Sequence, residues 1–208
     1  MSKSTTLFLI ISFILNSCAP NQVLKGYFPT NASPKSYKIP YFSNADLDYV
    51  YKTNISFYGK ELSGILIAKK INENTHRIVF TTEFGNKLFD FEISEDAFKI
   101  NSIVSELNRN ILINTLKADF RMLLRKQYAI KGAFENAEIT VYKSEVGKDI
   151  YYIFTSKTQN KLLKIVEASK RKEKINLSFI AENDIFARNI IVQHANINLR
   201  IELIFFKS

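Results

Sequence analysis

The sequence predicts a mainly β (α+β) domain: a strongly curved antiparallel sheet of about ten strands, with a helix covering its concave face. Three observations support this prediction. Apolar and polar residues alternate over much of residues 46–208, short turns separate the alternating segments, and one amphipathic segment interrupts them. The apolar fraction of 46% is typical of a chain that buries a core, so we expect a folded domain.

The first alternating segments predict a meander of antiparallel strands. In "YKTNISFYG", Thr53, Ile55 and Phe57 share one face, and Gly59 closes a turn into "ELSGILIAKKI". Gly85 and the asparagine after it predict a second tight turn, into "KLFDFEIS". In the strand between these turns, one face is predicted to hold His76, Ile78, Phe80, Thr82 and Phe84. Further strands, such as "KINLSFIA" and "INLRIELIFF", follow after residue 126.

An amphipathic helix is predicted over residues 109–126. Leu112, Leu116 and Phe120 recur at helical spacing, whereas Lys117 lies on another side. The preceding segment, "SEDAFKINSIVSELNRN", is ambiguous between a short strand and a helical turn. Because the concave apolar face of a curved sheet must be covered, we expect the helix to cover it.

The first residues are typical of an export signal. "MSKSTTLFLIISFILNSC" has a basic start and an apolar run far shorter than the roughly 20 residues of a membrane-spanning helix. The end of this run, Leu15-Asn16-Ser17-Cys18, resembles the bacterial lipobox, whose cysteine receives a diacylglycerol thioether and is then acylated. By this resemblance residues 1–17 are a lipoprotein signal peptide and Cys18 is the site of lipid attachment. Several acyl chains anchor a protein stably, so we expect a membrane anchor without a membrane span.

The positions of the prolines predict where the folded domain begins. All four prolines of the chain lie within its first 40 residues: Pro20, Pro29, Pro34 and Pro40. This shift in composition predicts an extended lipidated tether over residues 18–45 and a single domain over residues 46–208.

Composition limits the partners and cofactors. Lys and Arg outnumber Asp and Glu by 29 to 20, and the net charge of +9 favours anionic partners, although dispersed charges are also typical of an ordinary basic surface. "KRKEK", residues 170–174, is either a solvated hairpin tip or a contact with anionic lipid. The export signal argues against nucleic acid. Each histidine, His76 and His194, is expected to be half-buried in a strand, and with one cysteine they disfavour a metal site or a cofactor.

The sequence gives little support for an enzyme. It contains no nucleophile elbow, P-loop, dinucleotide-binding glycine motif or zinc-protease helix motif. Asp90 and Glu92 lie two apart on one strand face, roughly 7 Å from each other, which is within the range of paired glycosidase carboxylates. A solvated strand face produces the same spacing. We therefore expect that the protein is not an enzyme.

The lipobox, the tether and the meander "ISFYGKELSGILIAKKINENTHRIVFTTEFGNKLFDFEIS" together resemble the LolA/LolB-like proteins of lipoprotein localisation, in a form expected in Bacteroidetes-type bacteria. The resemblance rests on Gly64–Ile67, on Phe80–Phe91 and on the closing strands "NIIVQHANINLRIELIFF". It implies an unclosed β-barrel whose apolar cavity takes up the acyl chains of lipoproteins, and a lipid anchor that includes palmitate. With a lipidated Cys18, the chain resembles the membrane-anchored member of that family. This implies an outer-membrane lipoprotein facing the periplasm, with a periplasmic carrier protein as a candidate partner.

Two hypotheses of function follow. The first is a monomeric lipid or lipoprotein receptor or carrier that binds acyl chains in an apolar cavity between sheet and helix. The second is a structural lipoprotein subunit of an envelope complex, in which the same residues only fill a core. The predicted cavity residues come from successive strands: Ile55, Phe57, Ile65, Ile67, Ile78, Phe80, Phe89 and Phe91.

Overall fold

The computed structural model describes residues 21–31, 33–169 and 172–206 of the 208-residue chain. The predicted signal peptide, residues 1–17, and the predicted lipid attachment site, Cys18, lie outside this part. Within it, fourteen strands form an antiparallel sheet with one α-helix and two short 3-10 helices. Among the residues described, no helix is long and apolar enough to cross a membrane.

The helices are η2 (Gln22–Leu24), η3 (Ser105–Leu107) and α2 (Asn110–Leu123). The strands are β1 (Phe28–Thr30), β2 (Ser36–Lys38), β3 (Asp48–Phe57), β4 (Lys60–Lys70), β5 (His76–Thr81), β6 (Lys87–Ile93), β7 (Phe98–Ile103), β8 (Gln127–Glu135), β9 (Ile139–Val146), β10 (Asp149–Ser156), β11 (Leu162–Ser169), β12 (Lys172–Ala181), β13 (Ala187–His194) and β14 (Leu199–Phe205).

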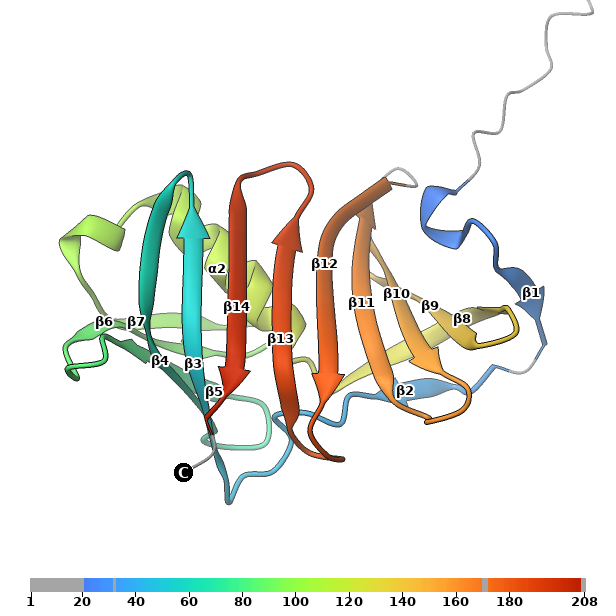
Figure 1. The fold of residues 1–208 in the computed structure, drawn as a ribbon, viewed down its shortest axis with the longest axis horizontal. Helices are drawn as coiled ribbons and strands as arrows, with labels where there is room; N and C mark the ends of the chain where they lie inside the picture. The colour runs from blue at the N-terminus through green and yellow to red at the C-terminus, as the bar shows by residue number, and fades with distance from the viewer. Residues whose placement is uncertain (1–20, 32, 170–171, 207–208) are drawn as a thin grey trace, which may run out of the picture.

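The sheet is curled but not closed, as predicted. Its strand order is β1-β8-β9-β10-β11-β12-β13-β14-β3-β4-β5-β6-β7, and β2 pairs with β8 beside β1. The last strand of the chain, β14, pairs with β3 and thereby joins the meander of β3–β7 to the strands that follow the helix. Figure 1 shows α2 on the concave side, behind β3, β13 and β14. The predicted fold class is therefore confirmed, with more strands than expected.

The structure explains why two positions in the meander are occupied by glycine. The β3–β4 hairpin turns through Tyr58 and Gly59, whose φ angles of 47° and 80° suit a two-residue turn between twisted strands. Gly64 in β4 lies so close to β5 that a Cβ atom would be 1.9 Å from the backbone oxygen of Thr81. No larger residue fits at Gly64 unless the two strands separate.

Helix α2 covers the predicted range with slightly tighter bounds. Leu112, Leu116 and Phe120 are each at most 3% exposed and form the face that packs on the sheet. The ring centroid of Phe120 lies 6.0 Å from that of Phe89 in β6. The helical period of apolar residues thus identified the covering helix correctly.

The segment expected as an extended tether, residues 18–45, is built into the domain from Asn21 onward. Strands β1 and β2 both pair with β8, and Ile39, Tyr41 and Phe42 behind them are 3%, 3% and 1% exposed. Pro29 is compatible with this pairing because β1 is at the margin of the sheet, where a missing N–H is tolerated. The folded part therefore begins well before residue 46.

The N-terminal segment also covers the outer face of strands β9–β11. Val23, Leu24 and Tyr27 pack against a small apolar cluster whose members include Tyr152 and Phe154. The side chain of Asn21 donates to the Tyr152 hydroxyl at 2.6 Å. Strand β10 is consequently buried on both faces, which explains its uninterrupted apolar run, "IYYIF".

Candidate functional site

The predicted cavity residues of β3, β5 and β6 fill the interior. Ile55, Ile78, Phe80, Phe89 and Phe91 are each at most 1% exposed and belong to one continuous apolar core. The rings of Phe89 and Phe91 stack with centroids 4.6 Å apart, and that of Phe80 lies 5.3 Å from Phe89. Their predicted role as the lining of an open cavity does not agree with this packing, because the rings fill the space beneath α2.

The prediction that Ile65 and Ile67 face the concave side is wrong. In β4 it is Leu66 and Ala68 that are buried, at 0% and 1% exposed, so the two isoleucines lie half-buried on the opposite face. The run "GILIA" is apolar on both faces, and alternation therefore cannot show which face is buried. Phe57, at the end of β3, is half-buried at the margin of the core.

Phe84, which the sequence predicts on the face shared by the core residues of β5, lies outside the strand. β5 ends at Thr81, and Phe84 follows in the turn, where it is 94% exposed. Gly85, with a φ of 84°, closes this turn and donates its N–H to the oxygen of Thr82 at 3.0 Å. The turn is therefore confirmed, and the strand is shorter than the alternation predicts.

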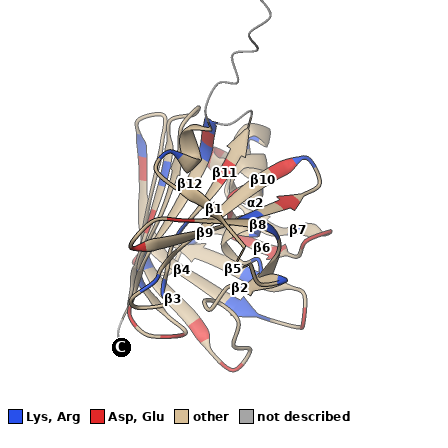
Figure 2. Ribbon diagram, turned by 90° about the vertical axis from the view of Figure 1, so that its right-hand side faces the viewer, with Lys and Arg blue, Asp and Glu red and all other residues tan. Residues whose placement is uncertain are grey.

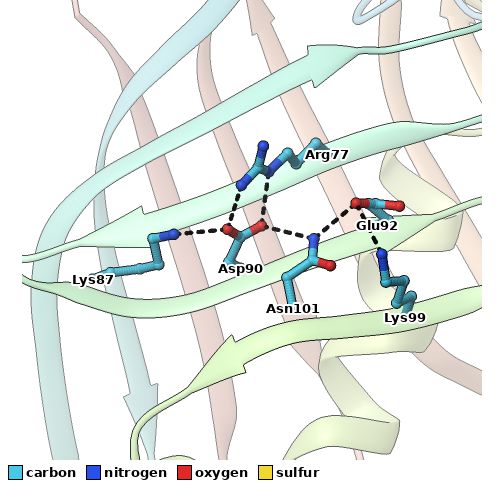
Figure 3. A network of polar contacts seen from close by, with 6 residues as sticks. All are labelled: Arg77, Lys87, Asp90, Glu92, Lys99 and Asn101. Atoms are coloured by element: carbon cyan, nitrogen blue, oxygen red, sulfur yellow. Dashed lines mark hydrogen bonds and ion pairs between the residues drawn. The ribbon is translucent and has the colours of Figure 1, made fainter.

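Asp90 and Glu92 lie on one face of β6, as expected, but Asp90 is fully engaged in ion pairs (Figure 3). Its carboxylate accepts hydrogen bonds from Arg77 Nε (2.9 Å) and Nη2 (2.7 Å), from Lys87 Nζ (2.8 Å) and from Asn101 Nδ2 (3.3 Å). The bonds from Arg77 hold the pKa of Asp90 well below its usual range, although burial opposes them. A general acid needs a raised pKa, so Asp90, which is 1% exposed and whose oxygens are occupied, is unsuited to act as the general acid of a glycoside hydrolase.

Aromatic rings fill the space beneath α2, whereas a cleft of about 690 Å³ opens at one end of the half-barrel. Its walls come from the segment after β2, the β4–β5 turn, the β6–β7 turn and the connection from α2 to β8. Ile39, Ile93 and Leu124 form apolar wall and floor, at 3%, 2% and 7% exposed. The cleft thus has the size and the apolar base of a small-molecule site.

Cationic side chains dominate the polar part of the cleft. Five of its lining residues are Lys or Arg, namely Lys38, Lys70, Arg121, Arg125 and Lys126, against the two acids Glu95 and Asp96. Elsewhere basic and acidic positions are dispersed over strands and turns, as Figure 2 shows. The excess of positive charge at the cleft makes it a candidate site for an anionic group.

Most of these cations are held by neutral oxygens. Arg121 Nε donates to the carbonyl of Ser94 at 3.0 Å, and Lys70 Nζ donates to that of Ser43 at 3.1 Å. Lys126 Nζ donates to the side-chain oxygen of Asn74 at 3.2 Å. These bonds tie the walls of the cleft to one another without neutralising the charges.

Arg125 is the most buried of the cations, with a side chain 14% exposed. Its Nη1 donates to Glu95 Oε1 at 2.7 Å, and its guanidinium carbon lies 5.3 Å and 5.9 Å from the ring centroids of Tyr128 and Tyr151. Within the described part of the chain, Arg125 Nε and the Tyr128 hydroxyl are buried with no hydrogen-bond partner. Burial raises the pKa of Tyr128, so its hydroxyl stays protonated.

His76 also lines the cleft and is more buried than the sequence predicted, at 3% exposed. Its Nε2 donates to the carbonyl of Phe42 at 2.8 Å. Burial lowers the pKa of His76, and the charges of Lys70 and Lys126 lower it further, against the opposing effect of the bond to Phe42. The ring is therefore neutral at pH 7 and fixes the segment after β2.

His194 lies in a buried polar cluster that joins α2 to the sheet. Its Nε2 is 2.8 Å and 3.0 Å from the two carboxylate oxygens of Asp119, which is 1% exposed. Nearby, Glu167 pairs with Lys174 and accepts from the Tyr151 hydroxyl at 3.3 Å. No group of three or more metal-ligating side chains occurs among the residues the structure describes.

Sequence reasoning did not find the cleft. Its lining residues come from four separate stretches, 38–43, 70–76, 93–96 and 121–127. The one signal was the basic end of the predicted helix, "RMLLRK", which is compatible with any solvated helix end.

The fold and the cleft define a structural class: an open, curled antiparallel sheet with a covering helix and a basic cleft at one end.

No family model matches the chain, and no curated protein sequence matches it. Solved structures are similar at low identity. A LolA superfamily protein from Nitrosomonas europaea is 8% identical with a TM-score of 0.49, over 80% of this chain and 87% of that one.

Two further solved structures have somewhat lower TM-scores. A DUF1329 family protein from Desulfovibrio piger is 12% identical with a TM-score of 0.42, over 77% of this chain and 84% of that one. An outer membrane lipoprotein-sorting protein domain from Vibrio parahaemolyticus is 7% identical with a TM-score of 0.44, over 77% of this chain and 83% of that one. The likeness concerns the arrangement of the elements alone.

Proposed function

We propose that this chain is a lipid-anchored protein of the bacterial envelope that binds the acyl chains of a lipid or lipoprotein at the cleft beside the end of α2. The observation that carries the proposal is a cleft of about 690 Å³ in which an apolar floor lies beneath a cationic rim. That combination fits an amphiphile, whose chain requires apolar surface and whose head group remains polar. The proposal assigns binding, and no catalytic step, to the protein.

The site of binding differs from the one the sequence predicts. The aromatic interior is filled by Phe80, Phe89, Phe91 and Phe120, so a ligand enters it only if these side chains move. The cleft, in contrast, is open as it stands. We therefore place the acyl chain against Ile93 and Leu124, where the cleft borders the core.

The anchor and the cleft support a periplasm-facing receptor. Only Ala19 and Pro20 separate the predicted lipidation site, Cys18, from Asn21, which already packs against Tyr152. A lipidated Cys18 would hold the domain close to the bilayer rather than on a long tether. In Figure 1, η2 lies in the upper part of the domain, and the elements around the cleft extend from the end of α2 into its lower half. The cleft would then face away from the membrane that carries the anchor.

A receptor with this orientation takes its ligand from the periplasmic side, and a soluble carrier protein is the partner that suits it. The position at the outer membrane and the role in lipoprotein localisation are taken from the LolA/LolB-like resemblance of the sequence. The second hypothesis, a structural subunit without a ligand, would apply if the cleft binds nothing.

Filling the cleft tests the proposal. Ser43 lines it and is exposed, so Ser43→Trp places a large ring in the cleft, whereas Ser36→Trp makes the same change on the neighbouring strand outside it. We expect a fluorescent lipid to bind the unchanged protein and Ser36→Trp equally, and to bind Ser43→Trp at least about tenfold more weakly, or about 1.4 kcal/mol. Equal binding by the two variants would place the ligand elsewhere.

The anchor is tested separately in a bacterial host. We expect the chain to incorporate radiolabelled palmitate and to fractionate with the outer membrane, and Cys18→Ser to lose both properties. A Cys18→Ser variant that still incorporates palmitate would contradict attachment at this residue.

A further inference from the structure

The cleft has more positive charge than its own acids neutralise. Glu95 already pairs with Arg125, which leaves Asp96 as the other acid of the lining. In the part of the chain that the structure describes, no carboxylate lies within ion-pair distance of the four remaining cations of the cleft, Lys38, Lys70, Arg121 and Lys126. Like charges gathered around one hollow repel each other, and an anion placed among them lowers the free energy.

The buried side of the cleft has an unused donor next to this charge. Arg125 Nε and the Tyr128 hydroxyl are both buried and have no hydrogen-bond partner among the described residues. The guanidinium of Arg125 lies over the ring of Tyr128. Leaving a buried polar group without a hydrogen-bond partner is energetically unfavourable. Arg125 Nε itself is closed to solvent, but the positive charge of this guanidinium at the cleft would stabilise an anion placed there.

The arrangement suits a phosphate group attached to an apolar chain. A guanidinium presents parallel N–H donors that match phosphate oxygens, and Arg121 and Arg125 line the same cleft from α2 and the residues just after it. The apolar residues beneath them, Ile93 and Leu124, would contact the chain. A zwitterionic or neutral head group would leave the excess charge unneutralised.

We infer that the cleft selects an amphiphile with an anionic phosphate head group, which Arg121, Arg125 and Lys126 contact. This inference rests on the proposed binding of acyl chains and specifies the class of ligand. The shared chemistry is a phosphate ester with a net negative charge and a fatty chain, whether it arrives as a free lipid or as part of a larger molecule.

The inference is tested with short-chain lipids that stay monomeric in solution. The probes are dihexanoyl phosphatidic acid, dihexanoyl phosphatidylcholine and inorganic phosphate, titrated by calorimetry into the full chain as Cys18→Ser. We expect phosphatidic acid to bind at least about tenfold more tightly than phosphatidylcholine. We expect inorganic phosphate to bind more weakly than phosphatidic acid, because it cannot use the apolar floor.

Two matched double variants distinguish the effect of the charges in the cleft from the effect of the overall charge of the protein. Arg121→Gln with Lys126→Gln removes two cations of the cleft, and Lys25→Gln with Lys60→Gln removes two exposed cations outside its lining. We expect the first pair to abolish the preference for phosphatidic acid while phosphatidylcholine binding changes less than about twofold, and the second pair to keep the preference. Arg125→Lys keeps the charge but loses the planar fork, and should weaken phosphatidic acid alone.

Each other outcome overturns the inference in a recognisable way. Equal affinity for both lipids in the unchanged cleft, or a preference that survives the loss of Arg121 and Lys126, removes the selectivity for a net negative head group but leaves acyl-chain binding intact. Inorganic phosphate binding as tightly as phosphatidic acid shows a plain anion site without a chain. No binding of either lipid removes the proposed function together with the inference.

Discussion

The aromatic interior around Phe89 and the cleft beside Arg125 share the same two elements, yet one is filled and the other is hollow. On α2, Phe120 packs against Phe89 and the next residue, Arg121, lines the cleft. On β6, Phe91 is in the stack of rings and Ile93 lies at the floor of the cleft. A short distance along each element thus separates a packed core from an open site.

The difference shows how side-chain chemistry decides where a hollow persists. Aromatic rings gain dispersion contacts and exclude water when they close on one another, so the space under α2 collapses. Lysines and arginines of one sign repel each other and remain hydrated, so the walls that carry them stay apart. We therefore expect the interior to determine stability and the cleft to determine binding.

Removing a ring from the filled region should have the largest effect. Phe89→Ala leaves a cavity among three other rings, and we expect a loss of about 3–5 kcal/mol in the free energy of unfolding, measured by urea denaturation. Phe84→Ala is the matched control, because Phe84 is 94% exposed and its loss should cost less than about 0.5 kcal/mol. Similar losses in the two variants would show that the ring stack is loose.

The buried pair between α2 and β13 should come next. Asp119→Ala leaves His194 buried without its carboxylate partner, and we expect a loss of about 3 kcal/mol in unfolding free energy. If the two residues act as a pair, the Asp119→Ala/His194→Ala double variant should be much less destabilised than the sum of the single variants. Additive losses would show that the pair does not link helix and sheet.

The ion-pair network on the outer face of β6 should contribute less. Asp90→Asn removes the charge that Arg77 and Lys87 contact, and we expect a loss of about 2 kcal/mol at pH 7. The half-exposed neighbour gives the control: Glu92→Gln should cost about 0.5 kcal/mol.

The pH dependence of Asp90 follows from the direction of its pKa shift. Because the folded pKa is lowered, the contribution of the carboxylate is fully present above its unfolded pKa of about 3.9 and is lost as the pH falls from there through the folded pKa. The difference between the unchanged protein and Asp90→Asn should therefore shrink below about pH 4 in urea denaturation. A difference that stays constant with pH would contradict the lowered pKa.

Charge removal in the cleft should have the smallest effect on stability. Lys126 is exposed and bonds to a neutral oxygen of Asn74, so Lys126→Gln should change the unfolding free energy by less than about 0.5 kcal/mol. A loss approaching that of Phe89→Ala would mean that the cleft is part of the structural core. Thermal unfolding of the two variants side by side makes this comparison directly.

Much of the fold is predictable from the sequence. Where one face of a strand or helix is buried and the other is exposed to solvent, the spacing of apolar residues shows which face is buried. The alternation around Ile55 and Phe89 identified strands and core positions, and the spacing of Leu112, Leu116 and Phe120 identified the helix. The same reasoning failed at Ile65, because β4 has apolar residues on both faces. It also failed for the described part of residues 21–45, because prolines are typical of a tether but are also tolerated in and beside short strands at the margin of a sheet: Pro29 lies in β1, and Pro34 and Pro40 flank β2.

By itself, the sequence determined the class of fold, the covering helix and the aromatic core, since these follow from short-range patterns along the chain. Cys18 as lipid attachment site stays a prediction of the sequence. The tertiary structure decided that the aromatic side chains fill the interior and that a basic cleft opens beside them. That cleft is assembled from four stretches between residues 38 and 127, and only the folding of the sheet brings their charges together.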